Sequence, residues 1–170
     1  MLRANNYNND SGIPFNSYYQ YEYNEFGILE KSSSYLFIPD SGYDFRSYLI
    51  YEHDSNNRIV KSTLYGTDNE IRAFWEFAYD SKGNLIYRNL HQNNGPSFHY
   101  RYEFDNKNNP LQLALNSFIA ANLSPNNVIV KLDSISTGEV SKLEYIYEYN
   151  SNDYPISYTY NSVTIKYEYY

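Results

Sequence analysis

The chain has 170 residues, a formal net charge of −7 at pH 7 and no cysteine. The acidic balance argues against binding to nucleic acid or to an anionic membrane surface. The lack of cysteine excludes disulfides, thiol nucleophiles and cysteine-ligated metals. Aromatic residues make up 19% of the chain and include 23 tyrosines, which excludes a disordered chain because so much ring area drives collapse.

The first 16 residues differ in composition from the rest. Residues 1–16 are rich in asparagine and contain Gly12 and Pro14, so we expect a flexible lead-in, followed by a single β domain over residues 17–170. Residues 1–6 lack the apolar run of a signal peptide, and no later segment approaches membrane-spanning length. Either the protein is cytosolic, or a leader lies outside this sequence.

One repeated unit is clearest in residues 77–87, which read FAYDSKGNLIY. Aromatic and polar residues alternate up to a turn, and an apolar run carries the chain back, which is typical of a β-hairpin. Asp80 opens the turn, because its side chain can cap the amides that follow. Gly83 suits the left-handed position that a type I turn with a bulge requires.

Five copies of this turn align on the opening residue. The openers are Asn24, Asp54, Asp80, Asp105 and Asn150. The residues three positions later are Gly27, Asn57, Gly83, Asn108 and Asp153. Glycine, asparagine and aspartate tolerate positive φ at the lowest cost, so we predict five hairpin turns with positive φ at this second set of positions.

Aromatic rings recur at a fixed place before each turn. The residues three positions before the openers are Tyr21, Tyr51, Phe77, Tyr102 and Tyr147. Those directly before the openers are Tyr23, His53, Tyr79, Phe104 and Tyr149. Alternate residues of a strand share a face, and helical periodicity is almost absent. The sequence therefore predicts an all-β fold, an antiparallel meander of about five repeated β-hairpins that forms a curved or partly rolled sheet.

One interval between openers is longer than the others. The intervals are 30, 26, 25 and 45 residues, so an aliphatic insertion separates the fourth and fifth copies. Residues 111–115 suit a returning strand, whereas residues 118–121 suit a short helix or a crossing loop. Because a single sheet cannot bury its aromatic face alone, we expect the insertion, or the curling of the sheet upon itself, to cover that face. If the insertion covers it, Leu113, Leu115, Phe118 and Ile119 are the residues predicted to be buried there.

The repeat resembles known families. Residues 78–85 (AYDSKGNL) resemble the YD repeat of Rhs-type wall and toxin-shell proteins. Residues 17–170 are similar to the uncharacterised YD-like-repeat lipoproteins of Bacteroidota, through 105–111 (DNKNNPL), 124–128 (SPNNV) and 147–155 (YEYNSNDYP). The resemblance implies a cell-envelope protein, anchored to the outer membrane by a lipid outside this sequence or secreted. The family supplies no activity to carry over.

Candidate metal ligands are few. The three histidines, His53, His91 and His99, do not fall at a metal-ligand spacing, and His53 is better explained as a ring in an aromatic position of the repeat. Turns 54–57 and 105–108 resemble calcium loops only faintly, since each offers one carboxylate and the second contains a lysine. We therefore expect no metal and no cofactor.

Candidate catalytic acids also have a simpler explanation. A pair of glycosidase acids is one reading of the glutamates that share a strand face, whereas the solvated face of a repeating sheet is the favoured reading. These residues are Glu22, Glu76, Glu103, Glu144 and Glu148. The sequence contains no nucleophile elbow, phosphate-binding glycine loop or His-Glu metal motif, so we expect a non-enzymatic protein.

Two functions fit these features. In the first, the rings form the core, and sheet edges or loops bind another cell-surface protein, which makes the chain an interaction or structural module. In the second, exposed tyrosines serve as stacking platforms for a glycan or another small ligand. The first is favoured, because a repeated ring position suits a core, whereas a ligand site needs only a few rings.

Overall fold

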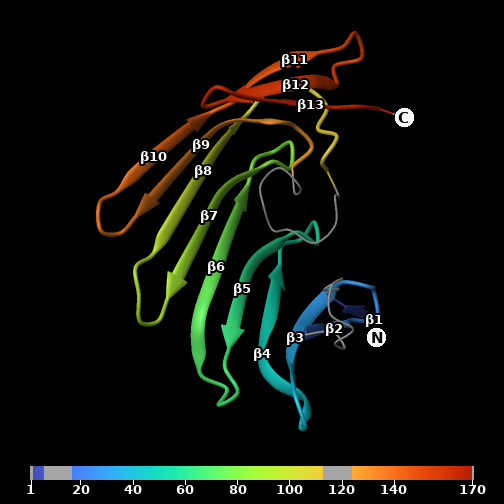
Figure 1. Ribbon diagram of the computed structural model, residues 1–170, viewed down its shortest axis with the longest axis vertical. Helices are drawn as coiled ribbons and strands as arrows, with labels where there is room; N and C mark the ends of the chain where they lie inside the picture. Colours follow the sequence, from blue (N-terminus) through green and yellow to red (C-terminus); the bar gives the residue numbers. More distant parts are fainter. Residues whose placement is uncertain (1, 6–16, 113–123, 170) are drawn as a thin grey trace. The chain divides into compact units, whose positions relative to one another are not determined.

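The computed structural model describes residues 2–5, 17–112 and 124–169 (Figure 1). These residues form strands, turns and loops without a helix, so the predicted all-β class is confirmed. The thirteen strands are β1 (Leu2–Asn5), β2 (Ser17–Tyr23), β3 (Leu29–Ile38), β4 (Gly42–His53), β5 (Ile59–Tyr65), β6 (Ile71–Tyr79), β7 (Leu85–Gln92), β8 (Phe98–Phe104), β9 (Val128–Ile135), β10 (Val140–Glu144), β11 (Ile146–Tyr149), β12 (Pro155–Tyr160) and β13 (Val163–Lys166).

The strands form an antiparallel meander, as the sequence predicts. Strands β1 to β10 follow one another in chain order in one sheet, and β11, β12 and β13 form a second sheet. The chain divides into two compact units. Unit 1 contains Met1–Glu76 and His91–Gly95, and unit 2 contains Phe77–Leu90 and Pro96–Tyr170.

The lead-in contributes a strand to unit 1. Leu2 pairs with Tyr21 and Asn5 pairs with Tyr18, so β1 lies antiparallel beside β2. The sequence placed these residues outside the sheet because asparagine-rich stretches are poor strand formers. Hydrogen bonds from a neighbouring strand outweigh that weak local preference. Residues 6–16 lie outside the described part of the chain.

A bulge at the same place in four of the five copies shows that the repeat is structural. In the first copy the register shifts between Glu22 and Tyr23, directly before the opener. Equivalent shifts occur in the second, fourth and fifth copies, at Glu52/His53, Glu103/Phe104 and Glu148/Tyr149. The extra residue lies in the returning strand, at Glu30, Val60, Ile129 and Ile156. It is a second bulge, separate from the positive-φ residue that the predicted turn type requires.

The ring three residues before the opener is the core position. Tyr51 in unit 1 is 7% exposed, and Phe77 and Tyr102 in unit 2 are 6% and 8% exposed. Tyr21 and Tyr147 are half-buried. The rings at this position therefore supply much of the core, as the favoured interpretation expects.

Small polar side chains make room for the core ring of unit 1. Ser32 and Ser62 are both buried, and Ser62 is the direct cross-strand partner of Tyr51. The Ser32 hydroxyl lies 2.8 Å from the Tyr51 hydroxyl, so the buried phenol is hydrogen-bonded. A larger residue at either serine would displace the ring.

The second sheet ends in a tight hairpin. Asn161 and Ser162 join β12 to β13 with φ of 44° and 64°, the pair of positive angles that a type I′ turn needs. One face of this sheet carries tyrosines in mutual contact, with ring centroids 5.4 Å apart for Tyr147 and Tyr158 and 5.8 Å for Tyr158 and Tyr167.

The structure does not test the prediction that the insertion covers the ring-bearing face. Leu113, Leu115, Phe118 and Ile119 all lie in residues 113–123, outside the described part of the chain. Across the described residues, no helix has the length and apolar character needed to cross a membrane.

Candidate functional site

The openers hold the turns through their side chains, as predicted. Asp80 Oδ1 accepts hydrogen bonds from the backbone N–H groups of Lys82 (2.9 Å) and Asn84 (2.8 Å). Asn24, Asp54 and Asn150 accept the same two bonds, from the residues two and four positions later. Burial would raise the pKa of Asp80, but these bonds and one from the Asn84 side chain outweigh it and lower that pKa.

Four of the five predicted positions have the expected backbone conformation. Gly27, Asn57, Gly83 and Asp153 have φ of 77°, 61°, 91° and 61°. Asn108 is the exception, since its φ is not positive. Its backbone N–H donates to the carbonyl of Asp153 instead of closing its own turn.

The fourth turn is interrupted by the insertion. Asp105 Oδ1 accepts from the N–H of Lys107, two residues later, and then from the N–H of Asn127, both at 3.0 Å. The N–H of Asp105 donates to the carbonyl of Asn127. Asn127 therefore occupies the position that, in the other copies, belongs to the residue four places after the opener. Residues 109–126 form an insertion within the turn, between Asn108 and Asn127.

Repeat length supports this assignment. The segment 109–126 contains 18 residues, and subtracting it from the 45-residue interval between Asp105 and Asn150 leaves 27. That value lies within the 25 to 30 residues of the other intervals. The fourth copy is thus an ordinary repeat with a split turn.

The two ends of the insertion are tied together. Asn109 donates from its backbone N–H to the carbonyl of Pro125 (3.1 Å) and from its side chain to the carbonyl of Ser124 (2.7 Å). The Asn126 side chain donates to the carbonyl of Lys107 (2.9 Å). The chain therefore leaves and re-enters the turn at one place.

The same end of the insertion contacts the third turn. Asn84 and Asn126 exchange two hydrogen bonds of 3.1 Å, and the N–H of Leu85 donates to the Ser124 hydroxyl at 3.0 Å. Asn84 is 1% exposed and Ser124 is fully buried. Asparagine was predicted only as a turn former, and this buried pairing role was missed.

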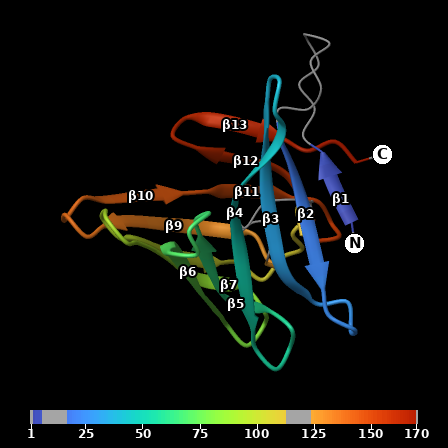
Figure 2. The ribbon, with the colours of Figure 1, turned by 90° about the horizontal axis from the view of Figure 1, so that it is seen from below.

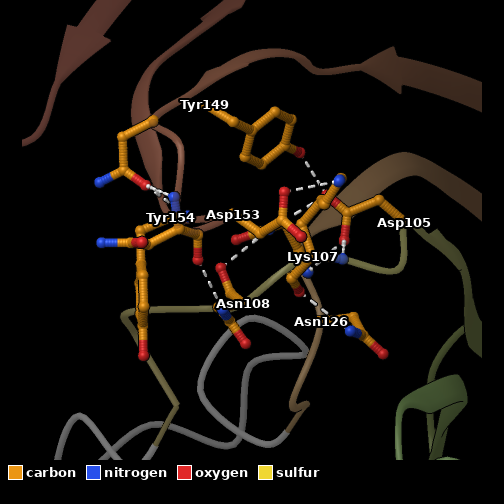
Figure 3. A network of polar contacts seen from close by, with 10 residues as sticks. Asp105, Lys107, Asn108, Asn126, Tyr149, Asp153 and Tyr154 are labelled. Atoms are coloured by element: carbon orange, nitrogen blue, oxygen red, sulfur yellow. Dashed lines mark hydrogen bonds and ion pairs between the residues drawn. The ribbon is translucent and has the colours of Figure 1, made fainter.

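The fifth turn completes the network (Figure 3). Lys107 Nζ lies 2.6 Å from Asp153 Oδ1, and the Asn108 side chain donates to the carbonyl of Asn152 at 3.1 Å. The Tyr149 hydroxyl donates to Asp105 Oδ2. Burial and that bond raise the pKa of Tyr149. We call this set the turn junction: Asn84, Asp105, Lys107, Asn108, Asn126, Asn127, Tyr149 and Asp153.

The turn junction has the character of a scaffold. Both carboxylate oxygens of Asp105 accept hydrogen bonds from groups of the chain itself, Oδ2 from the Asn127 side chain and from Tyr149. Lys107 is paired with Asp153. A network satisfied in this way fixes geometry, so the junction holds three turns of unit 2 in place.

A row of aromatic rings in unit 1 is the strongest candidate for a contact surface. Direct cross-strand pairing places its members on one sheet face, over β2 to β5. Tyr43 and Phe45 are 39% and 36% exposed, and the other members are half-buried. We call this set the ring ladder: Tyr18, Tyr35, Phe37, Tyr43, Phe45, Tyr48 and Tyr65.

Rings in the ladder contact one another through their faces. Tyr18 and Tyr35 are parallel within 7° at 4.6 Å, and Tyr48 and Tyr65 within 8° at 4.8 Å. These separations match the distance between neighbouring strands. Each of these rings is therefore stacked face to face on its direct cross-strand partner. One face of each of these four rings is already covered, which disfavours their use as sugar-stacking platforms.

Polar side chains lie next to Tyr48, a member of the ladder. Lys31 Nζ lies 5.3 Å from the centre of the Tyr48 ring, and the Tyr48 hydroxyl donates to Asn69 Oδ1 at 3.1 Å. Glu22 pairs with Lys31 at 3.0 Å on the same face. The ladder therefore has an ion pair at its border.

Two histidines have partners within the sheet. His91 Nε2 lies 3.1 Å from Glu76 Oε2, and its ring stacks on Phe74 at 4.5 Å. His99 Nδ1 lies 2.7 Å from Asn89 Oδ1. His53 ends β4, half-buried in the aromatic position where the repeat placed it.

The acidic residues are held by nearby groups of the strands and turns. Lys142 pairs with Glu144, and the Ser157 hydroxyl donates to Glu148 at 2.9 Å. Asp54, in one of the calcium-like turns, is paired with the Arg58 guanidinium at 2.7 Å. Within the described ranges, no three His, Cys, Asp or Glu side chains are grouped so that they could hold a metal ion.

Comparison with known proteins finds similar folds among solved structures. No protein-family model matches the chain, and no curated protein matches it. A porin-like protein from Bacteroides uniformis ATCC 8492 has a TM-score of 0.56 at 10% identity, over 89% of this chain and 67% of that one. A porin-like protein from Bacteroides vulgatus ATCC 8482 has a TM-score of 0.54 at 13% identity, over 86% and 76%. At such identities the likeness shows the fold alone.

Proposed function

We propose that this protein is a non-enzymatic module of the bacterial cell envelope that binds another protein. The ring ladder is the observation that carries the proposal, because a contiguous row of half-buried and exposed rings on one sheet face suits a contact surface, and tyrosine offers large area with a polar tip. The sequence suggested a contact through sheet edges or loops, whereas the proposed contact is a sheet face next to the β3–β4 hairpin, where Tyr43 and Phe45 are exposed.

The arrangement of the rings favours a protein over a glycan. A sugar stacks on an open ring face, whereas the two parallel pairs of the ladder stack on each other. A row of mutually stacked tyrosine and phenylalanine rings suits a partner that brings both apolar area and hydrogen-bonding groups, as protein surfaces do. The envelope location is supported by the resemblance to YD-like-repeat lipoproteins and by the fold shared with porin-like Bacteroides proteins.

Photo-crosslinking from the ladder tests the binding proposal. We expect benzoylphenylalanine in place of Tyr43 to form one defined protein adduct in cells that produce the protein. The matched control carries the same group at Phe26, which is 78% exposed in the β2–β3 turn and is not a member of the ladder. Equal labelling from both positions, or none from Tyr43, would contradict the proposal.

A glycan array tests the alternative ligand. Specific glycan binding that is lost in Tyr43→Ala and kept in Phe26→Ala would make the ladder a carbohydrate site. Location is tested separately, by fractionating cells that naturally produce the protein. Recovery in the soluble cytosolic fraction would contradict the envelope assignment without deciding what the ladder binds.

A further inference from the structure

The outer edge of the second sheet is suited to pairing with another strand. Within the part of the chain that the structure describes, β13 pairs with β12 alone and is the outer strand of the sheet (Figure 2). Its pairing is regular, without a bulge. A regular strand edge is a template for a further strand, although β13 is only 4 residues long and ends in Lys166, two features that weaken such pairing.

The backbone groups at this edge follow from the hairpin register. The N–H of Tyr167 donates to the carbonyl of Ile156 in the sheet interior at 3.0 Å. Backbone groups alternate in direction along a strand, so those of Val163 and Ile165 also face β12. The N–H and C=O groups of Thr164 and Lys166 therefore face outward.

We propose that two copies of this chain associate through β13, paired antiparallel edge to edge about a two-fold axis at Ile165. In this register Thr164 of each copy lies opposite Lys166 of the other, so the outward backbone groups meet as hydrogen-bonded pairs. Ile165 lies opposite its own copy in the closer, non-hydrogen-bonded type of pair. A surface that is complementary to itself forms a closed dimer.

The side chains are compatible with this register. Val163 and Ile165 are 47% and 40% exposed and share the ring-bearing face of the sheet. The register sets Val163 against Tyr167 of the other copy, so apolar groups cover one another. A shift that centres the axis on Lys166 would place two like charges directly opposite, which is unfavourable. β10, at the edge of the first sheet, carries the Lys142–Glu144 ion pair instead.

Single cysteines test the register directly, because the chain has no cysteine of its own. Ile165→Cys places the two sulfurs in a non-hydrogen-bonded pair with Cα atoms about 4.5 Å apart, within the range that a disulfide spans. We expect disulfide dimers to form at least 10-fold faster than with Thr164→Cys, the matched control one residue away. Equal rates for the two variants would overturn the register.

Substitutions of opposite charge at Ile165 test whether the two copies associate. We expect the native chain to dimerise in light scattering after size exclusion, and Ile165→Lys and Ile165→Glu each to weaken the dimer at least 10-fold. Mixing the two variants should restore a heterodimer. Thr164→Pro removes one outward N–H while leaving the β12 bonds, and should also weaken the dimer, with circular dichroism confirming the fold. A native chain that stays monomeric at 100 µM, on the order of weak-dimer affinities, would overturn the proposal.

Discussion

Asp105 and Asn127 are 22 residues apart in the sequence and are hydrogen-bonded as members of one turn. The Asn127 side chain donates to Asp105 Oδ2 at 3.0 Å, and in the third copy Asn84 donates to Asp80 Oδ2 at 2.9 Å. The two turns therefore have the same closing residue in space. In the fourth copy the chain reaches it only after the insertion.

Removing the Asp105 carboxylate should open the fourth turn. Asp105→Ala leaves two backbone N–H groups without their acceptor and should lower the free energy of unfolding by about 2–3 kcal/mol, measured by urea denaturation. Asp44→Ala, at an exposed position of β4, should change it by less than about 0.5 kcal/mol. Equal losses from the two substitutions would show that the turn junction is not a stabilising network.

The backbone conformation at Gly83 should decide which residues are accepted there. Gly83→Val should cost about 1–2 kcal/mol, because a β-branched residue fits φ of 91° poorly. Gly83→Asn should retain most of the stability, since asparagine already occupies the equivalent position of the second turn. Thermal denaturation of both variants gives the comparison, and similar losses for valine and asparagine would refute it.

Stability should fall at high pH because of buried tyrosines. Burial raises the pKa of Tyr102 from 10.0 to about 12, so the folded state holds this proton more tightly than the unfolded state. Its contribution is complete below pH 10 and is lost as pH rises from 10 to about 12. The free energy of unfolding of Tyr102→Phe should fall less than that of the native protein between pH 10 and about 12. The difference between the two proteins at pH 8 is the reference value. Parallel curves would contradict the assignment.

The stacked rings of the ladder should be coupled energetically. In a double-mutant cycle, Tyr18→Leu and Tyr35→Leu should show an interaction of about 0.5–1.5 kcal/mol. Tyr18 with Tyr65, which are not direct cross-strand partners, is the control pair and should be additive within about 0.5 kcal/mol. Additivity in both pairs would indicate that the parallel geometry contributes no stability.

The aliphatic insertion remains predicted to cover the ring-bearing face. If Leu115 and Phe118 are buried there, replacing either with alanine should cost about 2–5 kcal/mol in denaturant unfolding. Unchanged stability with loss of partner binding would instead identify the insertion as a contact surface.

Local chemistry explains which features the sequence could predict. Three features depend only on neighbours within a few residues, and their spacing in the sequence therefore predicted them. These are the turn openers, the positive-φ residues and the buried ring position. The split turn was not, because the closing residue Asn127 is separated from its opener by the insertion. A signal was present, since Asn127-Val128 repeats the Asn84-Leu85 pair that follows the third turn.

Two further features depended on pairing between strands. β1 is a strand only because β2 is beside it, and its composition gave no indication of this. The ring ladder includes Tyr35, Phe37, Tyr43 and Phe45, which lie outside the repeated ring positions. A register shift between Ser34 and Tyr35 sets which rings face one another, and no periodicity within one strand reports such a shift.

The split turn also offers a place to insert foreign sequence. Asn108 and Asn127 occupy positions that are consecutive in the other copies. The bonds from Asn109 to Ser124 and Pro125 hold the two ends of the insertion together. The entropic cost of closing a loop rises slowly with its length. An epitope, a fluorescent reporter or a second domain grafted between Asn109 and Ser124 would therefore be displayed from a fixed base, without a change in strand register.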